Sequence, residues 1–248
     1  MNSRSRPKVI DGSPRASLVI PCFNEAGNVL TLWQKLTELL DPNARIEIVL
    51  VDNGSSDGTR ELLRRVSSGQ HNVTVVELDN NLGYGGGIKA GLRVARGDIL
   101  GWSHADLQAD PSDFLRGVAL VEERGVSFVK GFRVRRPWFD KFFSLGTSVF
   151  ASLVFAELLR DINAQPTIYR DSRFHSLLAD GPDDFSFDLF AIVMARKLRL
   201  TETRFKVFFA NRLHGESAWN TSPRSRWKMV FRTATFCLVL RRSLARQC

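Results

Sequence analysis

The chain has 248 residues, of which 44% are hydrophobic, and a formal net charge of +9. This length suits one large α/β domain or two small ones, and the apolar fraction excludes a disordered chain. Three scattered cysteines (Cys22, Cys237 and Cys248) are too few for a disulfide framework or a zinc cage, which indicates a reducing compartment.

The excess positive charge is concentrated in two segments. Residues 223–248 hold seven Lys or Arg and no acid, and residues 130–145 hold five against Asp140 alone. Both segments also contain Trp and Phe, so they suit nucleic acid or an anionic membrane surface. The longest uncharged stretch, 142–156, is shorter than the roughly 20 apolar residues of a membrane span. The N-terminal 15 residues have no apolar stretch, so we expect no signal peptide.

From Ser17 onward, short β-branched runs alternate with helical patterns. We expect strands at 17–21, 46–52, 73–79, 98–103 and 127–132. We expect helices at 25–40, 57–66, 85–95 and 111–123. This alternation predicts βαβ units and an α/β fold with a mainly parallel sheet and helices on both faces.

The second half of the sequence is less regular. It predicts helices at 138–159 and 184–198, an extended piece at 201–212 and a basic helix at 224–244. We divide the chain into a flexible basic arm (1–15), a single α/β domain (16–222) and a basic amphipathic tail (223–248). The helix at 138–159 has an apolar stripe, which fits either a core helix or one lying on a membrane.

Polar clusters follow three of the predicted strands, at 21–25, 52–58 and 104–108. Ligands of open parallel sheets bind beyond the carboxyl ends of the strands. One acid at a strand end is usually a turn former or a helix cap. Two acids flanking one crevice, Asp52 and Asp106, favour a ligand site.

Five segments in order carry a family resemblance: SLVIPCFNEAGNV, EIVLVDNGSSDGT, NNLGYGGGIKAGLRVARGDILGWSHADLQADP, Gly131-Phe132-Arg133 and Arg212-Leu213-His214-Gly215-Glu216-Ser217. Together they resemble inverting family 2 glycosyltransferases of the GT-A fold, the group that includes dolichyl-phosphate mannose synthase and bacterial polyprenyl-phosphate sugar transferases. The resemblance implies a nucleotide-sugar half (16–133) and an acceptor half (134–222). It also implies transfer of a sugar from a nucleotide-diphosphosugar to a polyprenyl phosphate, at the cytoplasmic face of a membrane on which the protein is peripheral.

The resemblance also assigns a donor site. In it Asp52 accepts from a base N–H or a ribose hydroxyl, and Asn53 stands where the family more often has a second Asp. The residues expected to bind the nucleotide-sugar are Pro21, Phe23, Asn24, Glu25, Asp52, Asn53, His104, Ala105 and Asp106.

A divalent cation, Mn²⁺ or Mg²⁺, is the implied cofactor, because a nucleotide diphosphate needs charge neutralisation by a metal with oxygen ligands. The family's Asp-x-Asp-x-Gln motif aligns with His104, Asp106 and Gln108, so this sequence has His in place of the first Asp. An imidazole ligand favours Mn²⁺ over Mg²⁺. The alternative is that His104 ligates nothing and hydrogen-bonds a phosphate.

Catalytic roles are assigned to Asp106, Arg133, Asp188 and Arg212. Arg133 and Arg212 align with arginines that face the diphosphate or the acceptor phosphate, for which a guanidinium is the suitable group. A hydroxyl acceptor would need a base, and Asp188, or else Asp161, is the candidate. A polyprenyl phosphate is already an anionic nucleophile and needs none.

Several alternatives stay open. Ala218 replaces a Lys usual in the lipid-phosphate enzymes, which leaves room for a glycan or soluble hydroxyl acceptor. The chain could also be a non-catalytic nucleotide-sugar binder. Nucleic-acid binding does not explain Asp52, Asp106 or the glycines at 83–87, which we interpret as a turn opening a helix rather than a dinucleotide site; Lys89 nearby is expected to be solvated.

Overall fold

A computed structural model describes residues 13–134, 138–210, 212 and 223–246, with the side chains of residues 42, 138–145 and 223–229 outside the description. The strands are β1 (Ala16–Cys22), β2 (Ile46–Asn53), β3 (Val73–Leu78), β4 (Ile99–Trp102), β5 (Phe128–Val134), β6 (Thr167–Tyr169) and β7 (Glu202–Phe208). The α-helices are α1 (Ala26–Thr37), α2 (Thr59–Ser67), α3 (Gly83–Val94), α4 (Asp113–Arg124), α5 (Trp138–Phe155), α6 (Ser172–Leu178), α7 (Phe187–Lys197) and α8 (Pro223–Ala245). A 3₁₀ turn spans Pro42–Ala44.

The strands form one sheet in the order β3-β2-β1-β4-β6-β5-β7. Strand β6 runs antiparallel to β4 and β5, and the other neighbours pair in parallel. The α/β prediction is confirmed, but β6 and α6 were not expected. Strand β6 has three residues and follows Pro166, so its sequence has no alternation long enough to indicate a strand.

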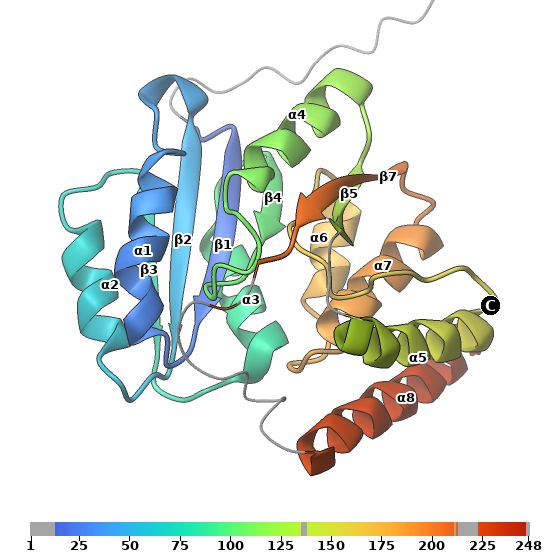
Figure 1. Cartoon of the computed structure of the whole chain (residues 1–248). Coiled ribbons are helices and arrows are strands. Elements are labelled where there is room, and N and C mark those ends of the chain that lie inside the picture. The colour runs from blue at the N-terminus through green and yellow to red at the C-terminus, as the bar shows by residue number, and fades with distance from the viewer. Residues whose placement is uncertain (1–12, 135–137, 211, 213–222, 247–248) are drawn as a thin grey trace, which may run out of the picture.

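Helices cover both faces of the sheet (Figure 1), and apolar residues fill the space between helices and strands on each face. Along β2, Val49 and Val51 face a core built with α3, α6 and α7, whereas Ile48 and Leu50 face a second core built with α1, α2 and α4. This alternation follows from the two-residue period of a strand. A strand buried on both faces reads as a continuous apolar run, which is why β2 was recognisable in the sequence.

Helices α5 and α8 lie side by side beyond the β7 side of the sheet (Figure 1). Ala151 of α5 and Cys237 of α8 are buried, while Val149 and Leu153 of α5 are 49% and 76% exposed. The apolar stripe of α5 therefore reaches the surface in the part whose side chains are described. Among the described residues, no helix is long and apolar enough to cross a membrane.

Two basic residues of the positively charged segment 130–145 are buried. Lys130 is fully buried, and the side chain of Arg133 is only 8% exposed. Lys89, expected in solvent, is 12% exposed; it donates to the carbonyl of Gly181 and pairs with Asp183. The charge excess at 130–145 is therefore partly internal ion pairing, which composition cannot distinguish from a surface patch.

The glycines at the start of α3 are required by close packing. A Cβ on Gly85 would lie 2.2 Å from the carbonyl oxygen of Pro182 and 2.9 Å from Cβ of Phe187. A Cβ on Gly87 would lie 3.1 Å from Cβ of Pro21. The segment therefore opens a helix, as expected, and its glycines let α3 approach both β1 and the segment before α7.

Candidate functional site

The carboxyl ends of β1, β2 and β4 meet at one edge of the sheet. Cys22 is in register with Asp52, and Val19 with Trp102. The polar segments that follow these strands are therefore neighbours, as the sequence predicts.

Asp52 lies below the surface of this edge. Its side chain is fully buried, its Oδ2 is 2.7 Å from Nε of Arg60, and its Oδ1 accepts a hydrogen bond from the Ser55 backbone N–H at 3.1 Å. The carboxylate thus holds the first turn of α2 against β2. Arg60, which the sequence analysis did not single out, also donates to the carbonyl of Leu78, the last residue of β3, and so links α2 to both β2 and β3.

The loops after β1 and β2 are joined by side-chain hydrogen bonds. Asn24, at φ +54°, accepts from the Ser56 backbone N–H at 2.9 Å. Asp57 accepts from the backbone N–H groups of Ala26 and Thr59, the first residues of α1 and α2. Burial tends to raise the pKa of Asp57, but a bond from the Thr59 hydroxyl at 2.6 Å, together with these two, outweighs it and lowers the pKa. The two helix starts are therefore fixed relative to each other, and Phe23 beside them is 40% exposed.

Asn53 is buried and serves the neighbouring loop. Its Nδ2 donates to the carbonyl of Gly83 at 2.9 Å, and its Oδ1 accepts from the Leu82 backbone N–H at 3.0 Å. An amide can give and accept these two bonds at once, which a carboxylate cannot. The departure from Asp at this position therefore has a structural reason, because both the nitrogen and the oxygen of the Asn53 amide bond the neighbouring loop.

Arg212 joins two carboxylates at the centre of the edge. Its Nη2 lies 2.8 Å from Oε1 of Glu25 and 3.5 Å from Oδ2 of Asp106. Burial raises the pKa of Glu25, opposed by its bonds from Asn28 and Arg212. The Nε of Arg212 is buried and has no hydrogen-bond partner among the described residues. A buried guanidinium N–H without an acceptor is costly, so Nε is a donor that an anionic ligand beside Arg212 could satisfy.

The segment after β4 is held by β7 and by α3. Gln108 and Ala210 exchange two bonds, from Ala210 N to the Gln108 carbonyl at 2.8 Å and from Gln108 Nε2 to the Ala210 carbonyl at 3.3 Å. These bonds bring Arg212 opposite Asp106, whose Oδ1 accepts from Gln108 N. Ala105 is buried, and the ring of His104 stacks on Tyr84 with centroids 5.3 Å apart.

These residues can hold a divalent cation only with help from a ligand. Among the residues that the structure describes, no three His, Cys, Asp or Glu side chains are grouped closely enough to form a metal cage. Asp106 offers a carboxylate, His104 an imidazole and Gln108 an amide oxygen, and phosphate oxygens would have to complete the shell. The set fits a metal–diphosphate complex, with Arg212 Nε as a further donor to the phosphate.

Arg133 is paired with Asp161. Its backbone N–H and Nε donate to the two carboxylate oxygens of Asp161 at 2.6 and 2.7 Å, and its guanidinium lies 5.1 Å from the Phe209 ring centroid. Both side chains are nearly buried. The structure therefore pairs two residues that the sequence analysis assigned separately.

Asp188 is 1% exposed, and its carboxylate accepts from donors on four other segments. They are Tyr84 Oη at 3.0 Å, Trp102 Nε1 at 3.2 Å, Gln165 Nε2 at 3.0 Å and Lys130 Nζ at 3.4 Å. Burial lowers the pKa of Lys130, opposed by Asp188. Burial also raises the pKa of Tyr84, which stays neutral. A base must reach the proton it removes, and this carboxylate is enclosed.

Sequence reasoning missed Tyr84, Lys130 and Gln165. Their partners are up to 104 residues away along the chain, and no spacing rule links such positions. The one available signal was a Lys inside a run of apolar residues, Phe128 to Phe132, which is typical of a buried and paired charge.

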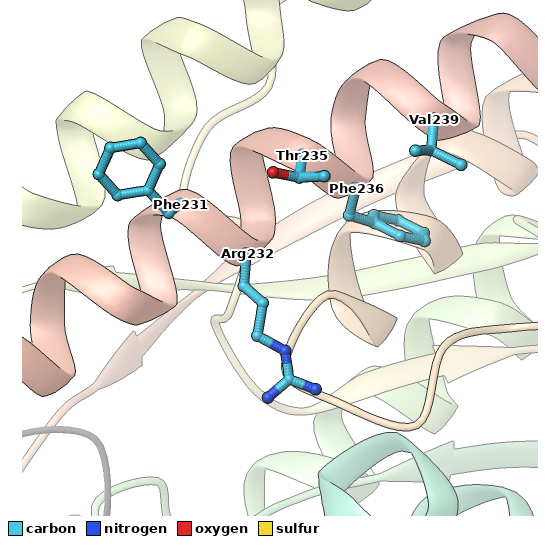
Figure 2. A pocket seen from close by; sticks show the side chains of 5 residues that line it. All are labelled: Phe231, Arg232, Thr235, Phe236 and Val239. Carbon is cyan, nitrogen blue, oxygen red and sulfur yellow. The ribbon is translucent and has the colours of Figure 1, made fainter.

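A pocket on α8 lies apart from these residues. Figure 2 shows its lining side chains, which are Phe231, Arg232, Thr235, Phe236 and Val239. Arg232 extends from the helix and pairs with Asp184, just before α7, at 2.9 Å. Phe231 and Val239 are 69% and 57% exposed.

Comparison with known families identifies the fold and the family. The model for glycosyl transferase family 2 matches residues 17–185, which include the ends of β1, β2 and β4. The chain belongs to glycosyl transferase family 2. The family prediction from the sequence is therefore confirmed.

Curated relatives within this family are similar over part of their length. The dodecaprenyl-phosphate galacturonate synthase of Rhizobium johnstonii is 34% identical over 122 residues, covering 48% of this chain and 36% of the relative. The undecaprenyl-phosphate 4-deoxy-4-formamido-L-arabinose transferase of Aeromonas hydrophila is 28% identical over 207 residues, covering 82% and 62%. The chain thus spans less than two thirds of the length of these relatives.

Solved structures show the same fold. The glucosyl-3-phosphoglycerate synthase of Mycobacterium tuberculosis, crystallised with Mn²⁺ and UDP, has a TM-score of 0.68 at 17% identity, covering 93% of this chain and 80% of that one. A mannosyltransferase of Pyrobaculum calidifontis, in complex with GDP-Man and Mn²⁺, has a TM-score of 0.62 at 19% identity, covering 93% and 74%. These likenesses confirm the GT-A fold.

Proposed function

We propose that this family 2 chain transfers a sugar, with inversion, from a nucleotide-diphosphosugar to a polyprenyl phosphate. The observation that carries the proposal is the position of Arg212, between Glu25 and Asp106, with its buried Nε lacking an acceptor. A diphosphate at this point would satisfy the guanidinium and bring its leaving-group charge next to Asp106. The curated relatives named for polyprenyl-phosphate transfer supply the acceptor class.

For the donor, we propose that the nucleoside lies along Pro21–Glu25 and the loop after β2. Phe23 offers an exposed ring, and the joined loops keep it in place. Asp52 holds the loop after β2 in place through Arg60 and Ser55. To contact the nucleoside, its carboxylate would accept a further hydrogen bond beside these two.

Asp106, His104 and Gln108 would hold the divalent cation, Mn²⁺ or Mg²⁺. When bound, the cation neutralises the diphosphate and so stabilises it as a leaving group. Arg212 binds the same diphosphate, and Glu25 orients the guanidinium. The mixed nitrogen and oxygen donors of this set favour Mn²⁺, the ion present in the two structural neighbours.

The acceptor phosphate is its own nucleophile. Its oxygen forms a bond to the anomeric carbon from the face opposite the diphosphate, whose bond to that carbon breaks. The second pKa of a phosphate monoester is about 6, so no base is required near neutral pH. This agrees with the burial of Asp188, which disfavours the alternative of a hydroxyl acceptor deprotonated by that residue.

We also propose that α5 and α8 rest on an anionic membrane at its cytoplasmic face. Apolar side chains on both helices are exposed, among them Phe150, Leu153 and Leu238. Arg241, Arg242 and Arg246 lie at the end of α8. Apolar contact together with basic charge is the combination that holds a peripheral helix on an anionic surface.

A donor screen tests the function. The full chain is incubated with UDP- and GDP-sugars, Mn²⁺ and undecaprenyl phosphate in anionic vesicles, and the lipid product is measured. One donor class should give product, and an Arg212→Lys variant should lose most of it, because an ammonium cannot reproduce the bidentate contact. Donor hydrolysis with no lipid product from any donor would contradict the acceptor assignment.

A further inference from the structure

The Lys130–Asp188 pair is a buried ionic centre beneath the donor edge. Both side chains are at most 1% exposed, and Lys130 Nζ also donates to Thr167 Oγ1 at 2.7 Å. Buried ion pairs are seldom the most stable filling for a core, because desolvation of the charges offsets their attraction. We therefore expect the role of this ion pair to lie in the side chains that Asp188 holds in position.

Asp188 holds two residues that flank Ser103, Trp102 directly and His104 through Tyr84. Trp102, the last residue of β4, donates to it directly. Tyr84 donates through its hydroxyl, which also accepts from Gln165 Nε2 at 2.8 Å, and the Tyr84 ring is stacked on His104. The Asp188 carboxylate therefore holds the end of β4 at Trp102 and, through Tyr84, the plane of the His104 ring.

The Tyr84 ring is held from both sides. Its other neighbour is Phe185, with centroids 4.9 Å apart and planes at 13°. Stacking alone would let the ring slide in its plane, and the hydroxyl bonds to Asp188 and Gln165 prevent that. The contact that the structure gives to the His104 ring is this stack on Tyr84, so we expect the stack to set the orientation of the imidazole.

We propose that Lys130, Asp188 and Tyr84 form a positioning relay that orients His104 at the metal edge, and that Asp188 is a positioning residue rather than the proton acceptor. The proposal rests on the proposed function only in placing His104 beside the donor diphosphate. Lys130 pairs with Asp188, Asp188 accepts a hydrogen bond from the Tyr84 hydroxyl, and the Tyr84 ring stacks on the imidazole. Supporting partners of this kind orient metal ligands in other proteins.

One double variant distinguishes Asp188 as a positioning residue from Asp188 as a catalytic base. Asp188→Asn leaves Lys130 buried without a counter-charge, so it should lower the thermal midpoint and weaken binding of Mn²⁺ alone by about tenfold. Adding Lys130→Met removes the second charge. A relay should then recover most of the midpoint, Mn²⁺ affinity and turnover, whereas a missing base cannot be restored by a change at Lys130.

Tyr84→Phe tests the hydroxyl with little risk to folding. Tyr169→Phe is a matched control, because Tyr169 is also buried but bonds His175 instead. We expect Tyr84→Phe to weaken Mn²⁺ binding, and Tyr169→Phe to leave it unchanged. In a His104→Asp background, Tyr84→Phe should have little effect on Mn²⁺, because the residue that it orients is absent.

A spectroscopic readout separates failure of the relay from failure of the proposed function. The imidazole NMR signals of His104 in ¹⁵N-labelled protein without metal should shift in Tyr84→Phe and Asp188→Asn, while those of His71 stay in place. Unchanged His104 signals would overturn the relay, as would an inactive double variant with normal Mn²⁺ affinity. If the wild-type protein fails to bind Mn²⁺ while the His104 signals still shift in the two variants, the metal assignment is contradicted and the relay is supported.

Discussion

Asp106 is the carboxylate on which the proposed donor site most depends. It lies beside Arg212 at the end of β4 and is the one proposed metal ligand that is anionic. Asp106→Ala should reduce kcat/KM by at least about a hundredfold with an unchanged thermal midpoint, because it removes charge stabilisation of the leaving diphosphate. Asp110→Ala is the control, since Asp110 pairs with Lys35. Retained activity with unchanged metal dependence would remove Asp106 from the site.

At His104 the expected effect is on metal preference. His104→Asp restores the usual family motif and replaces a nitrogen ligand with a harder oxygen ligand. Turnover should persist and the Mg²⁺ to Mn²⁺ activity ratio should rise. Metal titrations of both proteins with the preferred donor measure this ratio. Identical ratios would show that His104 is not a ligand.

The residue identities at the site were largely predictable, and their pairings were not. Asp52, Asp106 and Glu25 follow strand ends, so topology alone places them together. That Arg212 would lie between two of them, or that Arg133 would pair with Asp161, depends on loops whose ends are brought together by tertiary packing. Asp188 shows the same limit, because the apolar run around it, Phe187 to Met194, indicates burial but not the donors that it meets.

Among the elements, the strands from β1 to β5 and the helices between them were predictable to within a few residues. Each has a buried face with a clear period, and each is long enough for that period to be read. Helix α5 was expected to reach residue 159 but ends at Phe155, where Ala156 adopts φ +54°. The split into arm, domain and tail stays a prediction, and residues 1–12 and 213–222 lie outside the described structure.

The close approach of α3 to the segment before α7 gives a stability prediction. Gly85→Ala places a methyl group 2.2 Å from a backbone oxygen, so we expect a loss of about 1–3 kcal/mol in the free energy of unfolding. Gly146→Ala is the control, because a Cβ there meets nothing within 4 Å and removes a helical glycine at a gain of up to about 1 kcal/mol. Urea titrations measure both. Equal stability of the two variants would contradict this account of the glycines.

Deletion of residues 223–248 is expected to reduce binding to anionic vesicles and to raise the apparent KM for a long-chain acceptor more than for a short one. The structure adds that Cys237 and Leu240 of α8 are part of the core, so a deletion also uncovers apolar surface.

Arg242→Glu with Arg246→Glu is a cleaner test of membrane binding by α8, because both arginines are exposed. Each charge near the surface contributes about 1 kcal/mol, so vesicle binding should fall at least tenfold and should weaken with salt.

The matched control reverses Arg65 and Arg124, which are exposed on α2 and α4. It changes the net charge by the same amount on helices away from α8. Vesicle sedimentation at two salt concentrations compares the two double variants. Equal loss in both would mean that net charge, and not the α8 surface, governs binding.

On the scale of the whole molecule, the residues proposed to bind the nucleotide-sugar follow strand ends at one edge of the sheet, and α5 and α8 lie side by side (Figure 1). Both helices have exposed apolar side chains, and the end of α8 has exposed arginines. Arg232 ties α8 to the segment before α7, and α7 carries Asp188 beneath His104. A lipid phosphate reaching the donor edge from a membrane under α5 and α8 is therefore compatible with the way the elements are arranged.

The central claim, that the acceptor phosphate itself attacks the sugar, is tested by comparing two acceptors that differ only in the phosphate. Undecaprenyl phosphate and undecaprenol are presented in the same vesicles with the donor identified by the screen and Mn²⁺, and glycosylated lipid is measured for wild type and for Asp188→Asn with Lys130→Met. We predict product from the phosphate alone, in both proteins. Equal product from the alcohol, lost when Asp188 is replaced, would contradict the account and make Asp188 the base of a hydroxyl transferase.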